Sequence, residues 1–291
     1  MPTLWAELHE FLRSTPAEVH LNECNDDLVG FFNAVPREAI LHALSALTRD
    51  YQAVCPAPAL TVNLRPQQGQ AKAFAGKPRG GKNTQTKALW IEDLPAIVQL
   101  SFDTGVFLAT GVVFRQIRGT CIDNQLSPVL SSLPVLQRER MWRSSWQSQL
   151  ADGILHERHH ENTFICRYVD NRLILSTDEA LRSPLLYEFV QLNFYGKFAG
   201  DSIQLEEVTD HRFLGFHLNA AERTLEFAQP DRQWQIRHVH SAGSWTTRLA
   251  GFYSRKALIS KYAWPPSQRK VQIEALRRLY REAGYPANLL V

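Results

Sequence analysis

The sequence predicts an α+β fold in which helices pack on one face of an antiparallel sheet. Residues 164–175 place two apolar segments on either side of a tight turn, as in a β-hairpin. Residues 3–13 have the spacing of an amphipathic helix, and residues 245–283 are predicted to be mostly helical. The 291 residues, 44% of them hydrophobic, can bury a sizeable core.

The N-terminal part of the chain is predicted to hold two helices and one strand. Residues 27–32 read as a strand that runs into a turn, and a helix is expected from Pro36 to about Tyr51, because proline is accepted in a first helical turn. The first helix, residues 3–13, has apolar side chains along one side: Leu4, Trp5, Leu8, Phe11 and Leu12.

The middle of the chain begins with a polar, basic and glycine-containing segment, residues 61–88, which we expect to be a loop or a mobile hairpin. A helix is predicted over residues 94–109 and a strand over residues 112–118. A long helix is predicted over residues 126–142, entered through Ser127-Pro128.

The C-terminal half is predicted to begin with the hairpin, whose turn is placed at Asp170-Asn171 because this pair suits a tight turn. A helix follows over residues 184–192, then two strands over residues 203–208 and 212–218. The remaining helical segment is interrupted at Pro265-Pro266.

Composition excludes several classes of protein. The four cysteines contain no C-x-x-C pair, so a disulfide framework or a cysteine zinc site is not expected, and a reducing compartment fits. The N-terminus carries early acidic residues, so it is not a signal peptide and secretion is not expected. No apolar run has the length of a membrane span, so no membrane partner is expected.

The formal net charge is only +3, but the basic residues gather in two tracts. Such tracts favour an anionic partner, although two solvated surfaces would have the same composition. The first tract contains no acidic residue and comprises Arg65, Lys72, Lys77, Arg79, Lys82 and Lys87. The second tract comprises Arg255, Lys256, Lys261, Arg269, Lys270, Arg277, Arg278 and Arg281.

Two aspartates have the local context of a nucleotidyl-transfer site. Such a site holds two Mg²⁺ ions with carboxylates from distant segments, for instance at a strand end and in a hairpin turn. Asp27 and Asp170 have these contexts. Each could also be a plain cap or turn residue, and Asp26 is placed much like Asp27, which we prefer for its register with Gly30.

Four segments, in this order, resemble the motifs of reverse transcriptases, most closely the telomerase and Penelope-like branch. They are Asp27-Leu-Val-Gly-Phe-Phe-Asn-Ala-Val-Pro, Gln116-Ile-Arg-Gly-Thr-Cys-Ile-Asp-Asn-Gln-Leu-Ser-Pro, Arg167-Tyr-Val-Asp-Asn-Arg-Leu-Ile-Leu and Phe213-Leu-Gly-Phe. The resemblance implies an RNA-directed DNA polymerase that uses two Mg²⁺ ions, or Mn²⁺, with an RNA template, a DNA primer and deoxynucleoside triphosphates.

The resemblance also assigns roles to residues. Asp27 and Asp170 would bind metal, with Asn171 as a weaker third catalytic ligand. Phe32 would be the steric gate under the incoming sugar, and Gln116 and Gly119 would contact the nucleotide. The primer grip would be Phe213, Leu214, Gly215 and Phe216.

The resemblance further implies a right-hand palm over residues 22–220, with a basic insertion at about 61–90, and a helical thumb over residues 221–291. Residues 1–21 would be a residual part of the fingers, which are otherwise largely missing; a second chain is an alternative source of fingers. The family implies an intracellular location, nuclear or cytoplasmic.

Two departures from the motifs favour an alternative function. The hairpin has Asn171 where the family has a second aspartate, and an uncharged amide binds metal more weakly than a carboxylate. Asp123 stands where the family usually has glycine. The alternative is a catalytically weakened or inactive nucleic-acid-binding domain derived from a reverse transcriptase.

Overall fold

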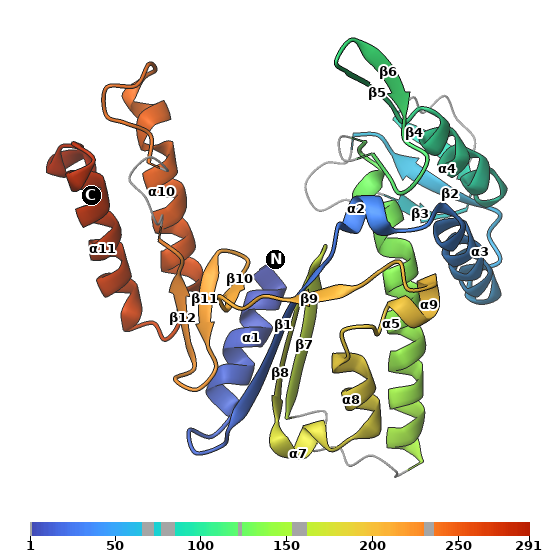
Figure 1. Ribbon diagram of the computed structural model, residues 1–291, viewed down its shortest axis with the longest axis horizontal. Helices are drawn as coiled ribbons and strands as arrows, with labels where there is room; N and C mark the ends of the chain where they lie inside the picture. The colour runs from blue at the N-terminus through green and yellow to red at the C-terminus, as the bar shows by residue number, and fades with distance from the viewer. Residues whose placement is uncertain (1, 66–72, 77–84, 122–123, 153–161, 230–235) are drawn as a thin grey trace. The chain divides into compact units, whose positions relative to one another are not determined.

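The computed structural model describes residues 2–65, 73–76, 85–121, 124–152, 162–229 and 236–291 (Figure 1). The chain forms two compact units. Unit 1 comprises Met1–Asp27, Leu155–Val190 and Glu206–Val291, and unit 2 comprises Leu28–Ile154 and Gln191–Leu205.

The main sheet of unit 1 has the strand order β7-β8-β1-β9. The strands are β1 (Leu21–Leu28), β7 (Thr163–Tyr168), β8 (Asn171–Thr177) and β9 (Leu205–Glu207). Strand β8 pairs antiparallel with β7 and with β1, so the predicted hairpin and antiparallel sheet are confirmed. The register of the β1–β8 pair brings Asp27 opposite Asn171.

Helices cover both faces of this sheet, whereas the sequence predicted helices on one face only. Leu173 and Leu175 belong to a core that includes side chains of α1 (Pro2–Ser14), which confirms the predicted first helix. On the opposite face, Arg172 donates a hydrogen bond to the Phe189 carbonyl on α8 (Pro184–Val190). Strand β8 is buried from its second residue to its last, and such a strand needs cover on both faces.

The second sheet of unit 1 consists of β10 (Arg212–Phe213), β11 (Phe216–Asn219) and β12 (Thr224–Phe227). The single strand predicted over residues 212–218 is therefore wrong. Leu214 and Gly215 have positive φ angles, 50° and 82°, and form a tight turn between two short strands. Two consecutive residues with positive φ give the turn twist that suits a hairpin.

Two long helices end unit 1, as predicted on either side of the proline pair. They are α10 (Trp245–Tyr262) and α11 (Gln268–Glu282), which lie side by side and are followed by η3 (Ala287–Leu289) (Figure 1). The Ser244 hydroxyl caps α10 by accepting a bond from the Thr247 amide at 3.2 Å. A short helix, α7 (Asp178–Leu181), follows β8.

Unit 2 is built around the contact between two helices, α3 (Arg37–Val54) and α5 (Ser127–Ala151). The first confirms the helix predicted after Pro36, and the second extends beyond the predicted end at Trp142. The shorter helices are α2 (Phe31–Ala34), η1 (Ile91–Asp93), α4 (Leu94–Asp103) and α9 (Gly196–Ala199). Among the described residues, no helix combines the length and apolarity needed to cross a bilayer.

Unit 2 also contains two small sheets. One has the order β3-β2-β4, and the other is the β5–β6 hairpin. The helix predicted over residues 94–109 ends at Asp103, because Thr104-Gly105 breaks it and the apolar residues beyond form a strand. The strands are β2 (Ala59–Asn63), β3 (Ala73–Ala75), β4 (Thr86–Trp90), β5 (Val106–Ala109) and β6 (Val112–Arg115).

Candidate active site

Asp27 and Asn171 form a direct pair in unit 1. Asp27 lies near the end of β1 and Asn171 is the first residue of β8, opposite it in the register. The Asn171 side-chain nitrogen donates a hydrogen bond of 2.9 Å to Asp27 Oδ1. Both residues are half-buried, so an ionic ligand could reach them from solvent.

The turn beside this pair has Val169 and Asp170 as its two central residues, one position earlier than the sequence predicted. Tyr168 and Asn171 close the turn as paired residues of β7 and β8. Val169 has φ 59°, a conformation that is unfavourable for a β-branched residue, and its carbonyl accepts a bond of 2.7 Å from Arg167. Asp170, which directly precedes Asn171 in the chain, is half-buried in this turn.

Asp26, the neighbour of Asp27, is a core residue. Its side chain is 2% exposed and lies against the fully buried guanidinium of Arg172. Two bonds join them, from Arg172 Nη2 at 2.6 Å and from Nε at 3.0 Å, both to Asp26 Oδ2. Arg172 also donates to the carbonyls of Phe189 at 2.6 Å and Val190 at 3.4 Å. Asp26 is therefore engaged, and Asp27 is the more accessible of the two carboxylates.

The oxygen donors at this site suit a hard cation. Asp27 and Asp170 offer carboxylate oxygens and Asn171 offers an amide oxygen, the donor types that Mg²⁺ prefers. Within the described part of the chain, no group of three or more His, Cys, Asp or Glu side chains could hold a metal ion. The donor set thus fits Mg²⁺ only with water and substrate oxygens completing its shell.

Glu23 lies on the same strand face as Asp27 and was not singled out from the sequence. Its carboxylate contacts His211 Nδ1 at 3.2 Å and accepts a bond of 3.5 Å from Asn25. Burial raises the pKa of Glu23, and His211 offsets part of this effect. Only the alternation of residues along β1 could have pointed to Glu23, since its partner His211 is 188 positions away.

Phe32 lies in unit 2, on α2, where its backbone is tied to the segment that contains Gly119. The Thr120 amide donates to the Phe32 carbonyl at 2.7 Å. Gly119 has φ 68°, and a Cβ atom there would lie 2.3 Å from the Phe32 oxygen and 2.7 Å from Asn33 Cα. Only glycine allows this close approach of the two backbones.

Gln116 and Arg37 hold the same segment in place. Gln116 Nε2 donates to the carbonyls of Arg118 at 2.8 Å and Thr120 at 3.0 Å. Arg37 donates to the carbonyls of Gln116 at 2.6 Å and Gly119 at 3.1 Å, and its guanidinium lies over the Phe102 ring. Arg37 was missed because nothing in its neighbourhood on α3 marks it. Asp123 lies outside the described residues.

The Phe213-Leu-Gly-Phe segment divides into two buried and two more accessible residues. Phe213 and Phe216 are 0% and 1% exposed. Their rings lie edge to face with Trp5, at centroid distances of 6.2 Å and 5.0 Å. In the turn, Leu214 is half-buried and Gly215 is exposed.

The first basic tract is described only at its ends. Arg65 follows β2 and Lys87 lies on β4, and both are exposed. The other four residues of the tract lie outside the described residues: Lys72, Lys77, Arg79 and Lys82.

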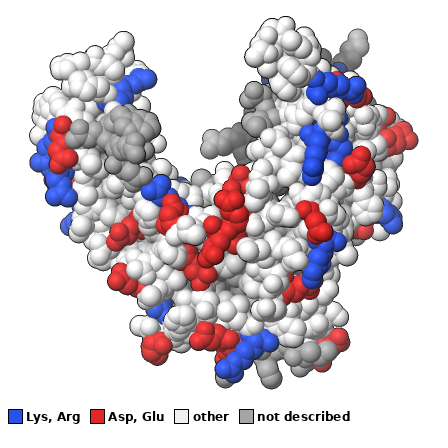
Figure 2. Space-filling view, in the orientation of Figure 1, with Lys and Arg blue, Asp and Glu red and all other residues white. Residues whose placement is uncertain are grey.

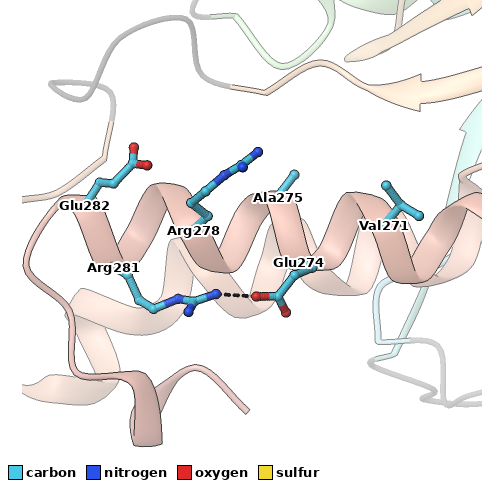
Figure 3. Close-up of a pocket in the computed structure, with 6 residues that line it drawn as sticks. All are labelled: Val271, Glu274, Ala275, Arg278, Arg281 and Glu282. Carbon is cyan, nitrogen blue, oxygen red and sulfur yellow. Dashed lines mark hydrogen bonds and ion pairs between the residues drawn. The ribbon is translucent and has the colours of Figure 1, made fainter.

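The second basic tract lies on α10 and α11, where Figure 2 shows blue side chains. Arg255 donates a bond of 2.7 Å to the Tyr280 hydroxyl, and Lys256 donates to the Val291 carbonyl at 2.6 Å. These two residues therefore tie the C-terminal segments together. Figure 3 shows one face of α11, where Arg281 pairs with Glu274 and Arg278 points away from that pair.

Comparison with known proteins finds solved structures with a similar fold. No protein-family profile and no curated protein sequence matches the chain. The structure of Candida albicans telomerase with the TWJ fragment of telomeric RNA matches 97% of this chain and 51% of its own, with a TM-score of 0.53 and 10% identity. The chain has a telomerase-like, reverse-transcriptase-type fold. Apo telomerase from Candida tropicalis matches 97% of this chain and 44% of its own, with a TM-score of 0.50 and 10% identity. The chain thus spans about half the length of these structures.

Proposed function

We propose that the chain is an RNA-directed DNA polymerase domain that transfers nucleotides by a two-metal mechanism. The observation that carries this proposal is the position of Asp27, which lies opposite Asn171 and next in the sheet to the Asp170 turn, within a telomerase-like fold. The strand end and the hairpin turn would thus supply two carboxylates from segments far apart in the chain, which would hold the metal ions of nucleotidyl transfer.

Asp27 and Asp170 would hold Mg²⁺ or Mn²⁺, and the Asn171 amide oxygen would be a weaker ligand. When bound, the ions would lower the negative charge on the reacting phosphate and activate the attacking hydroxyl. The chain's own residues would position the nucleotide: Phe32 would select against a 2′-hydroxyl, and the segment from Gln116 to Gly119 would pack against the base and sugar.

The remaining elements would bind the primer and the template. In this proposal the sheet of unit 1 is the palm and the α10–α11 pair is the thumb. The accessible Leu214-Gly215 turn would contact the primer strand, and Arg65, Lys87 and Arg278 would contact phosphates. The telomeric RNA fragment in the Candida albicans structure supports RNA as a partner, and in this proposal the RNA is the template. A second chain would be one source of fingers.

A second function is favoured by the bond between Asn171 and Asp27. This amide nitrogen donates to Asp27 Oδ1 and so stabilises the carboxylate without a metal ion. The alternative is therefore a nucleic-acid-binding domain in which catalysis has weakened or been lost.

Primer extension on an RNA template, with Mg²⁺ or Mn²⁺, tests the two functions. The wild-type chain is compared with Asp27→Ala and Asp170→Ala, and with Asp152→Ala as a control, because Asp152 is exposed at the end of α5. Extension that both site variants abolish and the control retains supports the polymerase. Absence of extension by the wild type, with salt-sensitive binding of an RNA–DNA duplex, supports the binding domain.

A further inference from the structure

We infer that the β5–β6 hairpin is a surface for self-association, on which a second copy of the chain adds its own β5–β6 hairpin edge to edge. The hairpin belongs wholly to unit 2 and extends away from the other elements of that unit (Figure 1). Its strands, Val106–Ala109 and Val112–Arg115, contain none of the residues of the proposed active site, so this inference is independent of the proposed function.

Both faces of the hairpin are apolar and exposed. The register pairs Phe107 with Phe114 on one face and Leu108 with Val113 on the other. The two phenylalanine rings stack at 5.7 Å, so that face is preformed. The exposed fractions are 57% for Val106, 52% for Phe107, 71% for Leu108, 54% for Val112, 70% for Val113 and 43% for Phe114.

A hairpin of this kind is not expected to remain uncovered. An isolated two-stranded hairpin is marginally stable in water, and contiguous exposed apolar patches mark interaction sites. Each of the six apolar side chains of the hairpin is at least 43% exposed, so the patch runs along both strands.

The edges of the hairpin are open as well. The sheet has two strands, and neither outer edge pairs with any other strand in the described ranges. The turn at Thr110-Gly111 has φ angles of 50° and 80°, the conformation that keeps two strands in a regular hairpin. Edge strands that avoid pairing usually carry lysine, proline or a bulge, and β5 and β6 carry neither lysine nor proline.

A second copy is the occupant that the charges favour. From Thr104 to Cys121 the sequence has only two charged residues, Arg115 and Arg118. Arg115 forms an ion pair with Asp103, and Arg118 donates to the Ala34 carbonyl at 3.3 Å. Figure 2 shows no charged side chain over the hairpin tip on the visible face. Two copies can therefore meet about a two-fold axis without unpaired like charges, and antiparallel pairing of β6 with itself is self-complementary.

Sedimentation analysis of the whole chain over a concentration series tests this inference. We expect a monomer–dimer equilibrium, and we expect Val113→Lys to weaken dimerisation at least 30-fold because it puts a charge on each copy at the contact. Val113 is exposed, so the substitution should leave the fold intact, as circular dichroism would check. Leu100→Lys is the matched control: Leu100 is 62% exposed on α4, outside the hairpin, and the variant should dimerise as the wild type does.

A cysteine variant locates the contact. Val113→Cys should form an intermolecular disulfide near the two-fold axis on mild oxidation, mapped by peptide mass spectrometry, and Leu100→Cys should not. A wild-type chain that stays monomeric up to about 100 µM overturns the inference. So does a dimer that Val113→Lys leaves unchanged, or one that the Leu100→Lys control disrupts equally.

Discussion

Asn171 donates a hydrogen bond of 2.9 Å to Asp27 Oδ1 across two neighbouring antiparallel strands. The bond joins the last polar residue of β1 to the first residue of β8. The partner of the Asp27 carboxylate is therefore a neutral amide. A carboxylate at position 171 would instead place a second negative charge beside Asp27.

Asn171→Asp should make the stability of the protein depend on metal. Without metal, the new carboxylate replaces a donor beside Asp27, and we expect a loss of about 1–2 kcal/mol in unfolding free energy. With Mg²⁺ the loss should be recovered, because the folded state binds the ion. Thermal unfolding in EDTA and in MgCl₂ measures both effects. Asn171→Ala is the control and should gain less from Mg²⁺ than Asn171→Asp, because it adds no third carboxylate. An Asn171→Asp variant that gains no more than this control contradicts a metal site here.

Three variants should show how much the buried Asp26–Arg172 ion pair contributes to the free energy of unfolding. Arg172→Leu or Asp26→Leu alone should cost about 3–5 kcal/mol of unfolding free energy, because each leaves an unpaired buried charge. The double variant should lie within about 1 kcal/mol of the wild type, since two apolar side chains need no partner. Urea unfolding measures these values. A double variant as unstable as the two single ones would show that the carbonyl contacts of Arg172 matter more than the ion pair.

Gly119→Ala should disrupt the segment that carries Gln116. The new Cβ would lie 2.3 Å from the Phe32 oxygen at φ 68°, so the two backbones must separate, at an expected cost of about 2–4 kcal/mol. Gly111→Ala is the matched control: its φ is 80°, but nothing lies within 4 Å of its Cβ, and its cost should be about 1 kcal/mol. Equal costs for the two variants would refute the close approach.

The cysteines should differ in their rates of alkylation. Burial raises the pKa of Cys24 and Cys166 to about 12, so almost no thiolate forms at pH 8. A hydrogen bond from Tyr51 lowers the pKa of Cys55, so its thiolate fraction is larger at the same pH. Iodoacetamide should modify Cys55 before Cys24 and Cys166, as timed by peptide mass spectrometry. Faster labelling of Cys24 than of Cys55 would show that β1 opens readily in solution.

The second basic tract should contain residues of two kinds. Arg278→Ala should leave stability unchanged and reduce the salt dependence of RNA–DNA duplex binding by a slope of about 1, because one phosphate contact is lost. Arg255→Ala should instead lower the unfolding free energy by about 1 kcal/mol, because Tyr280 loses its partner. Fluorescence anisotropy over a salt series and urea unfolding separate these effects. If the two variants changed duplex binding and unfolding free energy in the same way, Arg278 and Arg255 would not have different roles.

Local sequence patterns predict much of the fold. The hairpin of residues 163–177 is predictable because its strands are apolar and its turn is short, and the first helix because Trp5, Leu8 and Leu12 share one side. The prediction that a helix reaches Ala109 was wrong, because the apolar run Val106, Phe107 and Leu108 is compatible with a helix and with a strand. Only the break at Thr104-Gly105 distinguishes the two.

The candidate site is less predictable, because its residues depend on distant partners. Asp26 and Asp27 are chemically identical in the sequence, and Arg172, 146 positions from Asp26, decides which one is buried. The Phe213–Phe216 segment is predicted as one strand, because no neighbouring residue indicates that Leu214 adopts a positive φ angle. Arg37 holds two carbonyls that are 79 and 82 positions away, and no local pattern encodes such contacts.

The sheet order has a consequence for the time at which the site is formed. Strand β1 is synthesised well before its antiparallel neighbour β8, with 144 positions between Asp27 and Asn171. Pairings between such distant segments form late in folding, because a long loop must close first. During translation, the segment that becomes β1 therefore cannot pair with β8 until the residues of unit 2 up to Ile154 have been synthesised. In the nascent chain, Asp27 can form its hydrogen bond with Asn171 only after β8 has emerged from the ribosome.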